Sequence, residues 1–319
     1  MSAFYDKILD IKSRNQAYVI AEVGSNWKTR DDLMGAITLA KACGADAVKY
    51  QYFTESELYG PVPEIDKTFP LFHLKEKCDA IGIDFLCSTF SVPGMDEADK
   101  FLVAHKIASS EMSHVRLLER AKASNKPIIL STGAFFLADI RRTIEFLAGS
   151  ELILMHANLS YPTKLTDIKK FEALKSEVGD VPIGYSDHTT SVDLVPKIYK
   201  DMGVSVYEKH FNPFDYTDTA DAPHSLGRDE FKCMVSYLRG QPNDFNEENE
   251  GRLKHIRRVV AIKEIRPGDR LIEGENIGIF RVREADARGI SPFNLDRVIG
   301  KGATKVVEVG RGVSIADTV

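Results

Sequence analysis

Short apolar runs alternate with longer amphipathic stretches along most of this 319-residue chain, and no other sequence feature constrains the fold as strongly. Runs rich in aliphatic and β-branched residues predict eight strands, at Tyr18–Val23, Ala47–Gln51, Asp84–Ser88, Ala104–Ala108, Pro127–Ser131, Leu152–His156, Pro182–Ser186 and Ser205–His210. Helical spacing of apolar residues predicts helices at 32–43, 66–81, 113–123, 137–148, 167–178, 191–202 and 228–239. In the second of these helices, Phe69, Phe72 and either Leu74 or Cys78 are expected to face the core.

Repeated strand–helix units predict a parallel sheet, because parallel neighbours need a crossover connection. Eight predicted strands, nearly all followed by a predicted helix, within about 240 residues fit a closed (β/α)8 barrel, the TIM barrel architecture. An open, doubly wound sheet is the structural alternative. No GxGxxG pattern follows the first strand, so a dinucleotide-binding fold gains no support.

The sequence pattern changes after residue 240. Residues 241–254 are polar, acidic and poor in apolar side chains, which predicts a linker between a barrel domain at 1–240 and a small domain at 255–319. Within the tail, short strand-like runs alternate with turn signals at Pro267-Gly268-Asp269 and Glu273-Gly274. The tail is therefore predicted to be a small β-rich module.

The composition is that of an ordinary globular protein, with 43% hydrophobic residues, 28% charged residues and a net charge of −5. Nothing in this balance calls for nucleic acid, so an anionic substrate would need local positive charge. No apolar window is long enough for a membrane span, and the first residues lack the apolar core of a signal peptide. We therefore expect a cytoplasmic protein with neither a membrane nor a nucleic-acid partner.

Polar side chains gather at the carboxyl ends of the predicted strands, where barrels of this type carry their chemistry. They are Glu22, Lys49, Gln51, Ser88, Thr89, Lys106, Ser109, Glu111, Ser131, Ser186, His188, Glu208 and His210. Lysines beside hydroxyl groups suit a phosphate or carboxylate, and two histidines near a carboxylate suit a divalent metal ion. The set indicates a phosphorylated anion next to a Lewis-acid metal.

Each of these residue types also has a purely structural interpretation. Lys49 could pair with a glutamate inside the barrel, because a buried lysine needs a partner. His188 could serve only to cap the next helix, and His156 and His210 could be hydrogen-bonded core residues. The joint placement of the set on neighbouring strand ends, rather than any single residue, favours a functional site.

Seven segments around these residues resemble the sialic acid synthase family, which includes the synthases of pseudaminic, legionaminic and related nonulosonic acids. The segments are AEVGSN (21–26), GADAVKYQ (44–51), KIASSE (106–111), PIILSTG (127–133), GYSDHTT (184–190), EKHF (208–211) and SLGRDEF (225–231). In the tail, RRVVAIKEIRPGD and RGISP resemble the antifreeze-like (SAF) domain of that family. The resemblance covers nearly the whole chain, in the family's order.

The resemblance implies a role for each matched residue. His188 and His210 resemble two ligands of a divalent metal, Mn²⁺ or Mg²⁺. The site for phosphoenolpyruvate is implied to comprise Lys49, Lys106, Ser109, Ser131, Ser186 and Thr89. The sugar side is implied to comprise Gln51, Glu111, Tyr161 and Asp221, with Glu22 near the reacting centre. Arg281 resembles a tail arginine that, in a homodimer, reaches into the barrel of the partner subunit.

The departures from the family pattern fall mostly on the sugar side. Leu159 stands where the family has Ser or Asn before the tyrosine, and the DHxxSL loop is Asp221-Ala222-Pro223-His224-Ser225-Leu226. An expanded segment after Arg281 offers Arg283 and Arg288 as alternative tail arginines. The phosphoenolpyruvate and metal motifs are better kept, so the acceptor sugar stays open.

The implied activity is that of a transferase. Phosphoenolpyruvate would condense with N-acetylmannosamine, or a related open-chain 2-acetamido sugar, to give a nine-carbon 2-keto-3-deoxy acid and phosphate. One alternative is a synthase of pseudaminic or legionaminic acid, or one that uses a shorter acceptor sugar. Another is a metal-free barrel aldolase with a Schiff base on Lys106 or Lys49, and a third is a non-catalytic carbohydrate- or ice-binding protein.

Overall fold

The computed structural model describes residues 1–59, 68–158, 168–179, 181–189, 192, 195–241, 257–281, 289–314 and 317–318. The chain divides into two compact units, one formed by Met1–Pro213 and His224–Asn243 and the other by Phe214–Pro223 and Asp244–Val319. Apart from Gln241, the predicted linker at 241–254 lies outside the described residues. The two units are described one at a time below.

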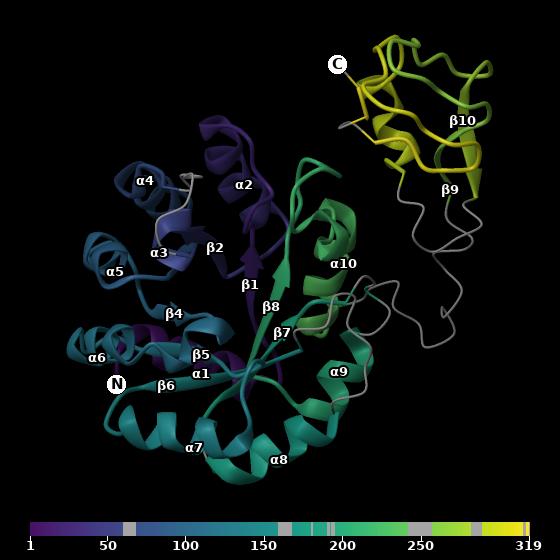
Figure 1. Cartoon of the computed structure of the whole chain (residues 1–319). Coiled ribbons are helices and arrows are strands. Elements are labelled where there is room, and N and C mark those ends of the chain that lie inside the picture. Colours follow the sequence, from purple (N-terminus) through teal and green to yellow (C-terminus); the bar gives the residue numbers. More distant parts are fainter. Residues whose placement is uncertain are drawn as a thin grey trace. The chain divides into compact units, whose positions relative to one another are not determined.

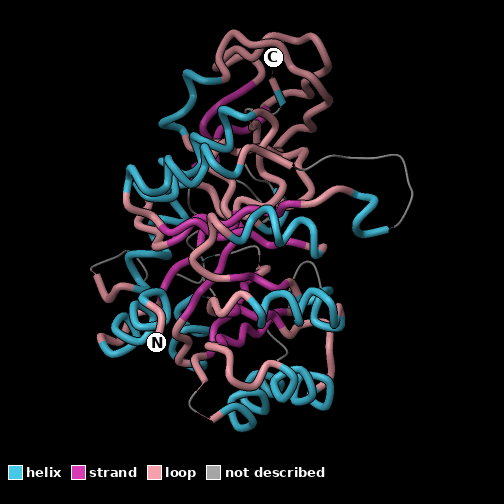
Figure 2. The backbone as a smooth tube through the Cα atoms, turned by 90° about the vertical axis from the view of Figure 1, so that its left-hand side faces the viewer, coloured by secondary structure: helices cyan, strands magenta, loops and turns pink. Residues whose placement is uncertain are grey.

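The first unit is a closed barrel of parallel strands in the order β1-β2-β3-β4-β5-β6-β7-β8, with β8 paired back to β1 (Figure 1). The strands are β1 (Tyr18–Glu22), β2 (Ala47–Tyr52), β3 (Asp84–Thr89), β4 (His105–Ile107), β5 (Ile128–Ser131), β6 (Leu152–Ala157), β7 (Ile183–Asp187) and β8 (Val206–His210). Figure 2 shows the same strands gathered in the interior, with helices around them. The prediction of a (β/α)8 barrel is therefore confirmed, and each predicted strand is present.

The helices of this unit are α1 (Ala3–Ser13), α2 (Arg30–Ala42), α3 (Glu55–Tyr59), α4 (Leu71–Ile81), α5 (Val92–Asp99), α6 (Val115–Ala123), α7 (Leu137–Phe146), α8 (Ile168–Val178), α9 (Val195–Met202) and α10 (Arg228–Leu238). The sequence pattern did not predict α1, α3 or α5. Helix α5 starts with Pro93 in its first turn and has Ser91 as its N-cap, whose hydroxyl accepts from the Gly94 amide. These are start signals of a helix, but its eight residues are too few to show an apolar period.

Helix α4 corrects one prediction about the core. The predicted helix began at residue 66, whereas the observed one begins at Leu71, directly after Pro70. Its buried face consists of Leu71, Leu74 and Cys78, and Phe72 is 55% exposed. Phe72 was expected to face the core and does not, because the later helix start turns it away from the buried face.

The amino-terminal end of the barrel is filled by apolar side chains. Residues alternate between the two sides of each strand, so every second residue points into the barrel. Near the starts of the strands these inward positions hold Tyr18, Ile129 and Val206, which belong to one buried cluster with Phe4 and Ile8 of α1. Helix α1 thereby closes this end, and the polar positions nearer the strand ends face the other opening.

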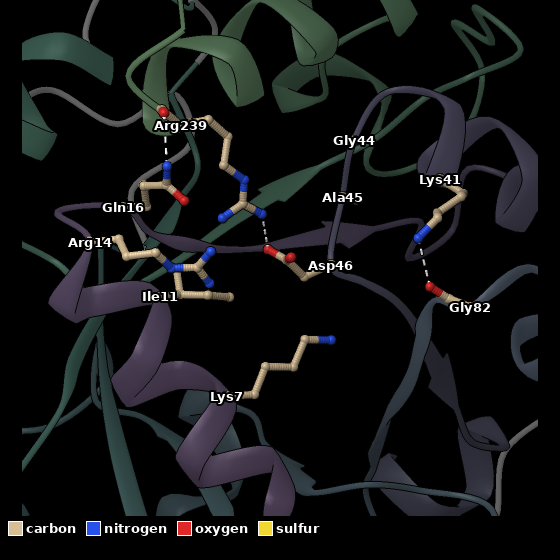
Figure 3. A pocket seen from close by; sticks show the side chains of 10 residues that line it. All are labelled: Lys7, Ile11, Arg14, Gln16, Lys41, Gly44, Ala45, Asp46, Gly82 and Arg239. Atoms are coloured by element: carbon tan, nitrogen blue, oxygen red, sulfur yellow. Dashed lines mark hydrogen bonds and ion pairs between the residues drawn. The ribbon is translucent and has the colours of Figure 1, made fainter.

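A cavity of about 370 Å³ lies outside that closed end, and its cations are Lys7, Arg14, Lys41 and Arg239 (Figure 3). Each of these side chains already donates to or pairs with an oxygen atom of the protein. Arg239 is the most buried of the four. Its guanidinium donates to the Ala17 carbonyl at 2.7 Å and forms an ion pair with Asp46. These contacts tie α10 to the first two strands, which is a structural role.

The second unit has its own small core. Strands β9 (Arg257–Ala261) and β10 (Ile277–Arg281) pair antiparallel, and buried residues such as Val259, Leu271 and Val313 pack into one cluster. Gly268 and Gly274 have φ angles of +92° and +82°, as the predicted turns require. The predicted small β-rich module is thus present. Within the part of the chain that the structure describes, no helix has the length and apolarity to span a bilayer.

Candidate active site

Four charged side chains meet inside the barrel, at its carboxyl-terminal opening. The Lys49 ammonium nitrogen lies 2.7 Å from Glu22 Oε2 and 3.7 Å from Glu208 Oε1. The Lys106 nitrogen lies 3.6 Å from the same Glu208 oxygen. All four side chains are at most 5% exposed. Two ammonium groups and two carboxylates give this group, the charged cluster, no net charge when all four are ionised.

Hydroxyl and amide groups surround the charged cluster. Lys106 Nζ donates to Ser131 Oγ at 2.8 Å, and Lys49 Nζ donates to Ser88 Oγ at 3.3 Å. The Ser186 hydroxyl donates to Glu208 Oε1 at 3.0 Å, and the Gln51 amide donates to Glu22 Oε1, also at 3.0 Å. These contacts join strands β1, β2, β3, β4, β5, β7 and β8 in one buried polar network.

The environment separates the pKa values within the charged cluster. Burial and the neighbouring Lys49 ammonium lower the pKa of Lys106 to about 8, although Glu208 opposes the change. Burial also acts to lower the pKa of Lys49, but Glu208 and Glu22 outweigh it and raise that pKa. Burial disfavours ionised Glu208, yet the two lysines and the Ser186 hydroxyl hold its pKa below the usual range. Lys106 is thus the ammonium group that loses its proton more readily.

Ser109 lies at the same opening, where its hydroxyl accepts from the Gly133 amide at 3.0 Å, two residues after Ser131. A Cβ on Gly133 would lie 2.7 Å from the Ala157 carbonyl oxygen, so only glycine fits this turn. Thr89 is buried at the end of β3, and Glu111 lies in the 3₁₀ helix η1 (Ser109–Ser113). Among the described contacts, none joins Thr89 or Glu111 to the charged cluster.

The two predicted metal-ligating histidines lie side by side. His188 follows β7 and His210 ends β8, and their ring centroids are 5.6 Å apart. The His188 Nδ1 atom lies 2.9 Å from the Asn158 carbonyl oxygen, which orients the ring, and Nε2 lies 3.5 Å from the Ser186 hydroxyl. Burial is the main cause that lowers the His188 pKa, so the ring is neutral at pH 7, as a metal ligand requires.

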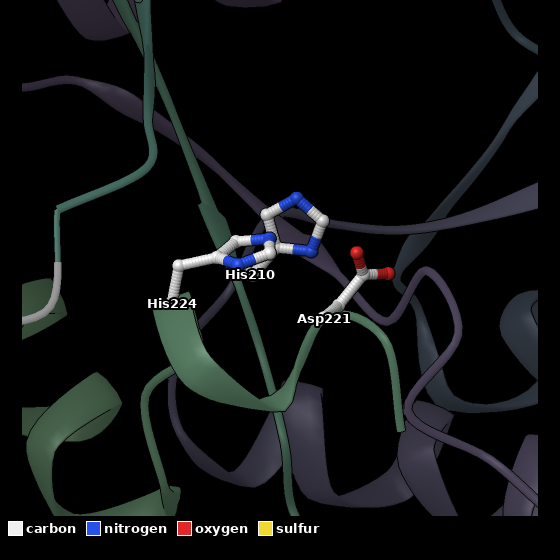
Figure 4. A group of neighbouring side chains, drawn as sticks. All are labelled: His210, Asp221 and His224. Atoms are coloured by element: carbon white, nitrogen blue, oxygen red, sulfur yellow. The ribbon is translucent and has the colours of Figure 1, made fainter. Parts of the chain in front are cut away.

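Further donor groups lie beside His210 (Figure 4). Nitrogen atoms of His210 and His224 and a carboxylate oxygen of Asp221 all lie within 4.8 Å of one another. Imidazole nitrogen and carboxylate oxygen are the donors that first-row divalent ions bind. These residues and His188 therefore fit a divalent metal ion, which is the chemistry that the sequence predicted at this place.

A set of buried contacts around Asp187, called the lock below, holds the turn that carries His188. The Asp187 carboxylate accepts from the Tyr207 hydroxyl at 2.7 Å and from the Thr189 amide at 2.8 Å. Lys209 Nζ lies 3.3 Å from the same carboxylate and also donates to the Thr189 carbonyl. These residues alternate along β7 and β8 with the polar network, so they fix both strand ends from the side that faces the helices.

The structure brings most of the predicted site residues together within the barrel unit. Tyr161, Arg283 and Arg288 lie outside the described residues, so their roles remain predictions. Arg281 ends β10 in the second unit, where its side chain is exposed. Lys49 does pair with barrel glutamates, as its structural interpretation required. Because Glu22 and Glu208 belong to the polar network, this pairing makes Lys49 part of the network as well.

Sequence reasoning gave no role to three residues of the site, which are Ser88, Glu208 and His224. Glu208 lies two residues before His210, so the strand period alone places both side chains inside the barrel. Ser88 has the same kind of signal, because it is two residues beyond Leu86 on β3. No spacing rule points to His224, which reaches the site only through the fold of the loop after β8.

Comparisons with known proteins show the family of this chain. The model of the NeuB family matches residues 70–247, more than half of the 319-residue chain. An uncharacterised protein of Methanocaldococcus jannaschii is 33% identical over 307 residues, which covers 89% of each chain. The chain belongs to the NeuB family.

Two other relatives have named activities. The N,N'-diacetyllegionaminic acid synthase of Legionella pneumophila is 27% identical, with 95% of this chain and 96% of that protein covered. Among solved structures, the N-acetylneuraminic acid (sialic acid) synthetase of Leptospira borgpetersenii superposes with a TM-score of 0.63 at 26% identity, covering 75% of this chain and 93% of that one. The expected resemblance to the sialic acid synthase family is thereby confirmed.

Proposed function

We propose that this protein is a metal-dependent synthase that condenses phosphoenolpyruvate with an open-chain 2-acetamido sugar. The observation that carries the proposal is the convergence of Lys49, Lys106 and the surrounding serines with His188 and His210 at one barrel opening. The named relatives make sialic and legionaminic acids, which supports this class of reaction. The product would be a nine-carbon 2-keto-3-deoxy acid, released together with phosphate.

The lysines and hydroxyls would hold the phosphate and carboxylate of the enolpyruvate. Lys106 and Ser131 share a hydrogen bond, Ser109 follows β4, and Ser186 lies near the end of β7. An ammonium group beside several hydroxyl donors is a typical binding arrangement for such anions. Thr89 belongs to this set by resemblance, and its place at the end of β3 is compatible with contact at the rim.

His188 and His210 would hold the divalent ion, Mn²⁺ or Mg²⁺ in the simplest form of the proposal. When bound, such an ion supplies Lewis-acid stabilisation of negative charge that develops on the sugar's aldehyde oxygen, a contribution of several kcal/mol. The neutral state of His188 and the fixed orientation of its ring favour this role. Mn²⁺ and Mg²⁺ both also accept oxygen ligands, so Asp221 can contribute beside them.

The chain's own residues would align the two substrates. Carbon 3 of the enolpyruvate bonds to the aldehyde carbon, water adds at carbon 2, and cleavage of the carbon–oxygen bond releases phosphate. Glu22, fixed by Lys49 and Gln51, lies where a carboxylate can orient that water or a sugar hydroxyl. Holding both reactants in place accelerates such a bimolecular step by removing its entropy cost.

The sugar side follows from resemblance and stays less specific. Gln51, Glu111, Tyr161 and Asp221 would contact the acceptor, and Arg281 would reach the barrel of the partner subunit in a homodimer. The tail would then act as the antifreeze-like (SAF) cap of the partner's site. N-acetylmannosamine and diacetamido sugars are the candidate acceptors, since the relatives include synthases that form both kinds of product.

A phosphate-release assay tests the proposal. The full-length protein is incubated with phosphoenolpyruvate, Mn²⁺ and either N-acetylmannosamine or the diacetamido precursors of legionaminic and pseudaminic acids. Release is expected with at least one acceptor, and EDTA should abolish it until metal is restored. If no acceptor of this class supports release, the proposed substrate pair is wrong.

Lys106 favours a second candidate, an aldolase that works through a Schiff base. A buried lysine with a pKa of about 8 is a better nucleophile than an ordinary lysine. Borohydride with a keto acid substrate would then attach the substrate's mass to a peptide that contains Lys106. The synthase predicts no such adduct and a complete dependence on metal, so the two activities are distinguishable in one experiment.

A further inference from the structure

Three imidazole rings, not two, converge at the rim of the barrel. The ring centroids of His210 and His224 are 4.5 Å apart, and the centroid of His188 lies 5.9 Å from that of His224. The ring centroids of the remaining pair, His188 and His210, are 5.6 Å apart. All three side chains are buried, with 7–8% of their surface exposed.

The separation of the rings fits a shared metal ion. With a metal–nitrogen bond of about 2.1 Å, two imidazoles on one tetrahedral or octahedral ion have centroids roughly 4.5–5.5 Å apart. The three observed separations run from 4.5 to 5.9 Å. The three ring separations are therefore compatible with one nitrogen of each ring binding a common ion.

The backbone holds His224 beside His210. The Leu226 amide donates to the His210 carbonyl at 2.9 Å, and the Asn212 amide donates to the Leu226 carbonyl at the same distance. The Asn26 side-chain amide donates to Ser225 Oγ at 2.8 Å and to the Phe211 carbonyl at 3.3 Å. The segment that starts at His224 is thus paired like a short extra strand against the end of β8. These hydrogen bonds fix the position of the backbone that carries the His224 ring.

We propose that His224 is a third imidazole ligand of the metal ion held by His188 and His210. The site consequently selects nitrogen-preferring ions such as Co²⁺, Fe²⁺ or Zn²⁺ over Mg²⁺. Imidazole suits these ions, whereas Mg²⁺ prefers an all-oxygen octahedral shell. The inference rests on the proposed metal site but is independent of which sugar the protein uses.

The test measures metal binding to the full-length apo-protein, without substrate. Co²⁺ is titrated by calorimetry and by its visible absorption, which reports ligand number and type, and Mg²⁺ is titrated by calorimetry. The variants are His224→Gln, which keeps a polar side chain of similar reach, and His188→Ala. His73→Ala is the matched control, because it removes an exposed imidazole from α4. Circular dichroism of each apo-protein checks that the fold is kept.

The wild type and His73→Ala are expected to bind one Co²⁺ per chain with the same affinity. His224→Gln should weaken Co²⁺ binding by ~10–100-fold, as loss of a supporting or direct ligand does, and change the visible spectrum. Mg²⁺ affinity should change by less than ~3-fold, since Mg²⁺ makes little use of imidazole. The ratio of Co²⁺ to Mg²⁺ affinity therefore falls.

Two other results separate this inference from the proposed function. If His188→Ala abolishes Co²⁺ binding while His224→Gln retains wild-type affinity and spectrum, the metal site exists and His224 is not a ligand. If the wild type itself binds no Co²⁺, the metal-dependent synthase is wrong and the third ligand with it.

Discussion

The Lys49 ammonium nitrogen lies 2.7 Å from Glu22 Oε2, and the side chains are only 3% and 1% exposed. The register of the barrel sets this contact, because Glu22 of β1 is the direct partner of Lys49 on β2. A buried charge that loses its partner is strongly destabilising, since the low dielectric leaves the other charge without compensation. Each of these two residues therefore makes the other tolerable inside the barrel.

Replacing only one of the pair should cost more than replacing both. Lys49→Met is expected to lower the free energy of unfolding by about 3–5 kcal/mol. The double variant Lys49→Met/Glu22→Gln should recover part of that loss, because no unpaired carboxylate remains at position 22. Urea unfolding followed by fluorescence checks this, since Trp27 is the one tryptophan of the chain and belongs to the barrel unit. Equal losses in both variants would contradict the coupling.

The lowered pKa of Lys106 predicts how activity depends on pH. Lys106 is charged below its pKa of about 8 and neutral above it, so the grip on an anionic substrate weakens as pH rises through 8. Above this pKa, the value of kcat/KM for phosphoenolpyruvate should decrease with rising pH, and the decrease should approach about tenfold per pH unit. Lys49 does not share the effect, because its pKa is raised. A flat profile from pH 7 to 9.5 would show that the Lys106 charge does not govern substrate capture.

Because the charged cluster has no net charge, we predict that the binding of phosphoenolpyruvate depends on a bound metal ion. The carboxylates of Glu22 and Glu208 balance both lysines, so the opening has little spare positive charge for a multiply charged anion. A divalent cation on the nearby histidines would supply it through Coulomb attraction. Calorimetry should show at least ~10-fold weaker binding in EDTA than with Mn²⁺, or roughly 1.4 kcal/mol.

Glu208→Gln is the partner experiment for that prediction. The amide keeps the size of the side chain and leaves the lysines with excess positive charge. Binding of phosphoenolpyruvate in EDTA should therefore become tighter than in the wild type. Weaker binding in this variant would mean that Glu208 acts by holding the lysines in position rather than through its charge.

The barrel and most of its polar network could be predicted from the sequence because both depend on short periods. Alternation along each strand places Lys49 and Gln51 on one face and links Ser186 to His188. Eight strands of one kind then leave few topologies. Contacts between strands need the register, so the sequence could not show which glutamate compensates which lysine.

Other features escaped because no local pattern encodes them. Helix α5 is short and carries Pro93 and Gly94, two residues with low helix propensity. The helix forms nevertheless, because its N-cap and its packing stabilise it. Phe72 lies on the exposed side of α4 because the helix begins later than its hydrophobic period suggested. His224 depends on a loop that pairs with the end of β8, a contact that only the tertiary fold creates.

The lock beneath His188 predicts a measurable loss of stability. Tyr207→Phe removes the hydroxyl that donates to Asp187 in a fully buried place. The expected cost is about 1–3 kcal/mol, because a buried carboxylate oxygen loses one of its donors. Tyr199→Phe is the matched control, since its hydroxyl donates to the Asn15 carbonyl at the surface and should cost less than about 1 kcal/mol. Similar losses in the two variants would argue against the lock.

The opposite end of the barrel should affect stability without affecting catalysis. Arg239→Ala removes the ion pair with Asp46 and the hydrogen bond to the Ala17 carbonyl, for an expected loss of about 2–3 kcal/mol. Its kcat/KM should stay within twofold of the wild type, because the charged cluster lies at the other opening.

Arg14→Ala provides the control, since its pair with Asp10 is mostly exposed and should contribute less than about 1 kcal/mol. Urea unfolding and initial rates with saturating metal measure the two effects separately. If a variant at position 239 kept its stability but lost turnover, the cavity at the amino-terminal end would have a functional role. The contacts of its four cationic side chains with protein oxygens indicate a structural role instead.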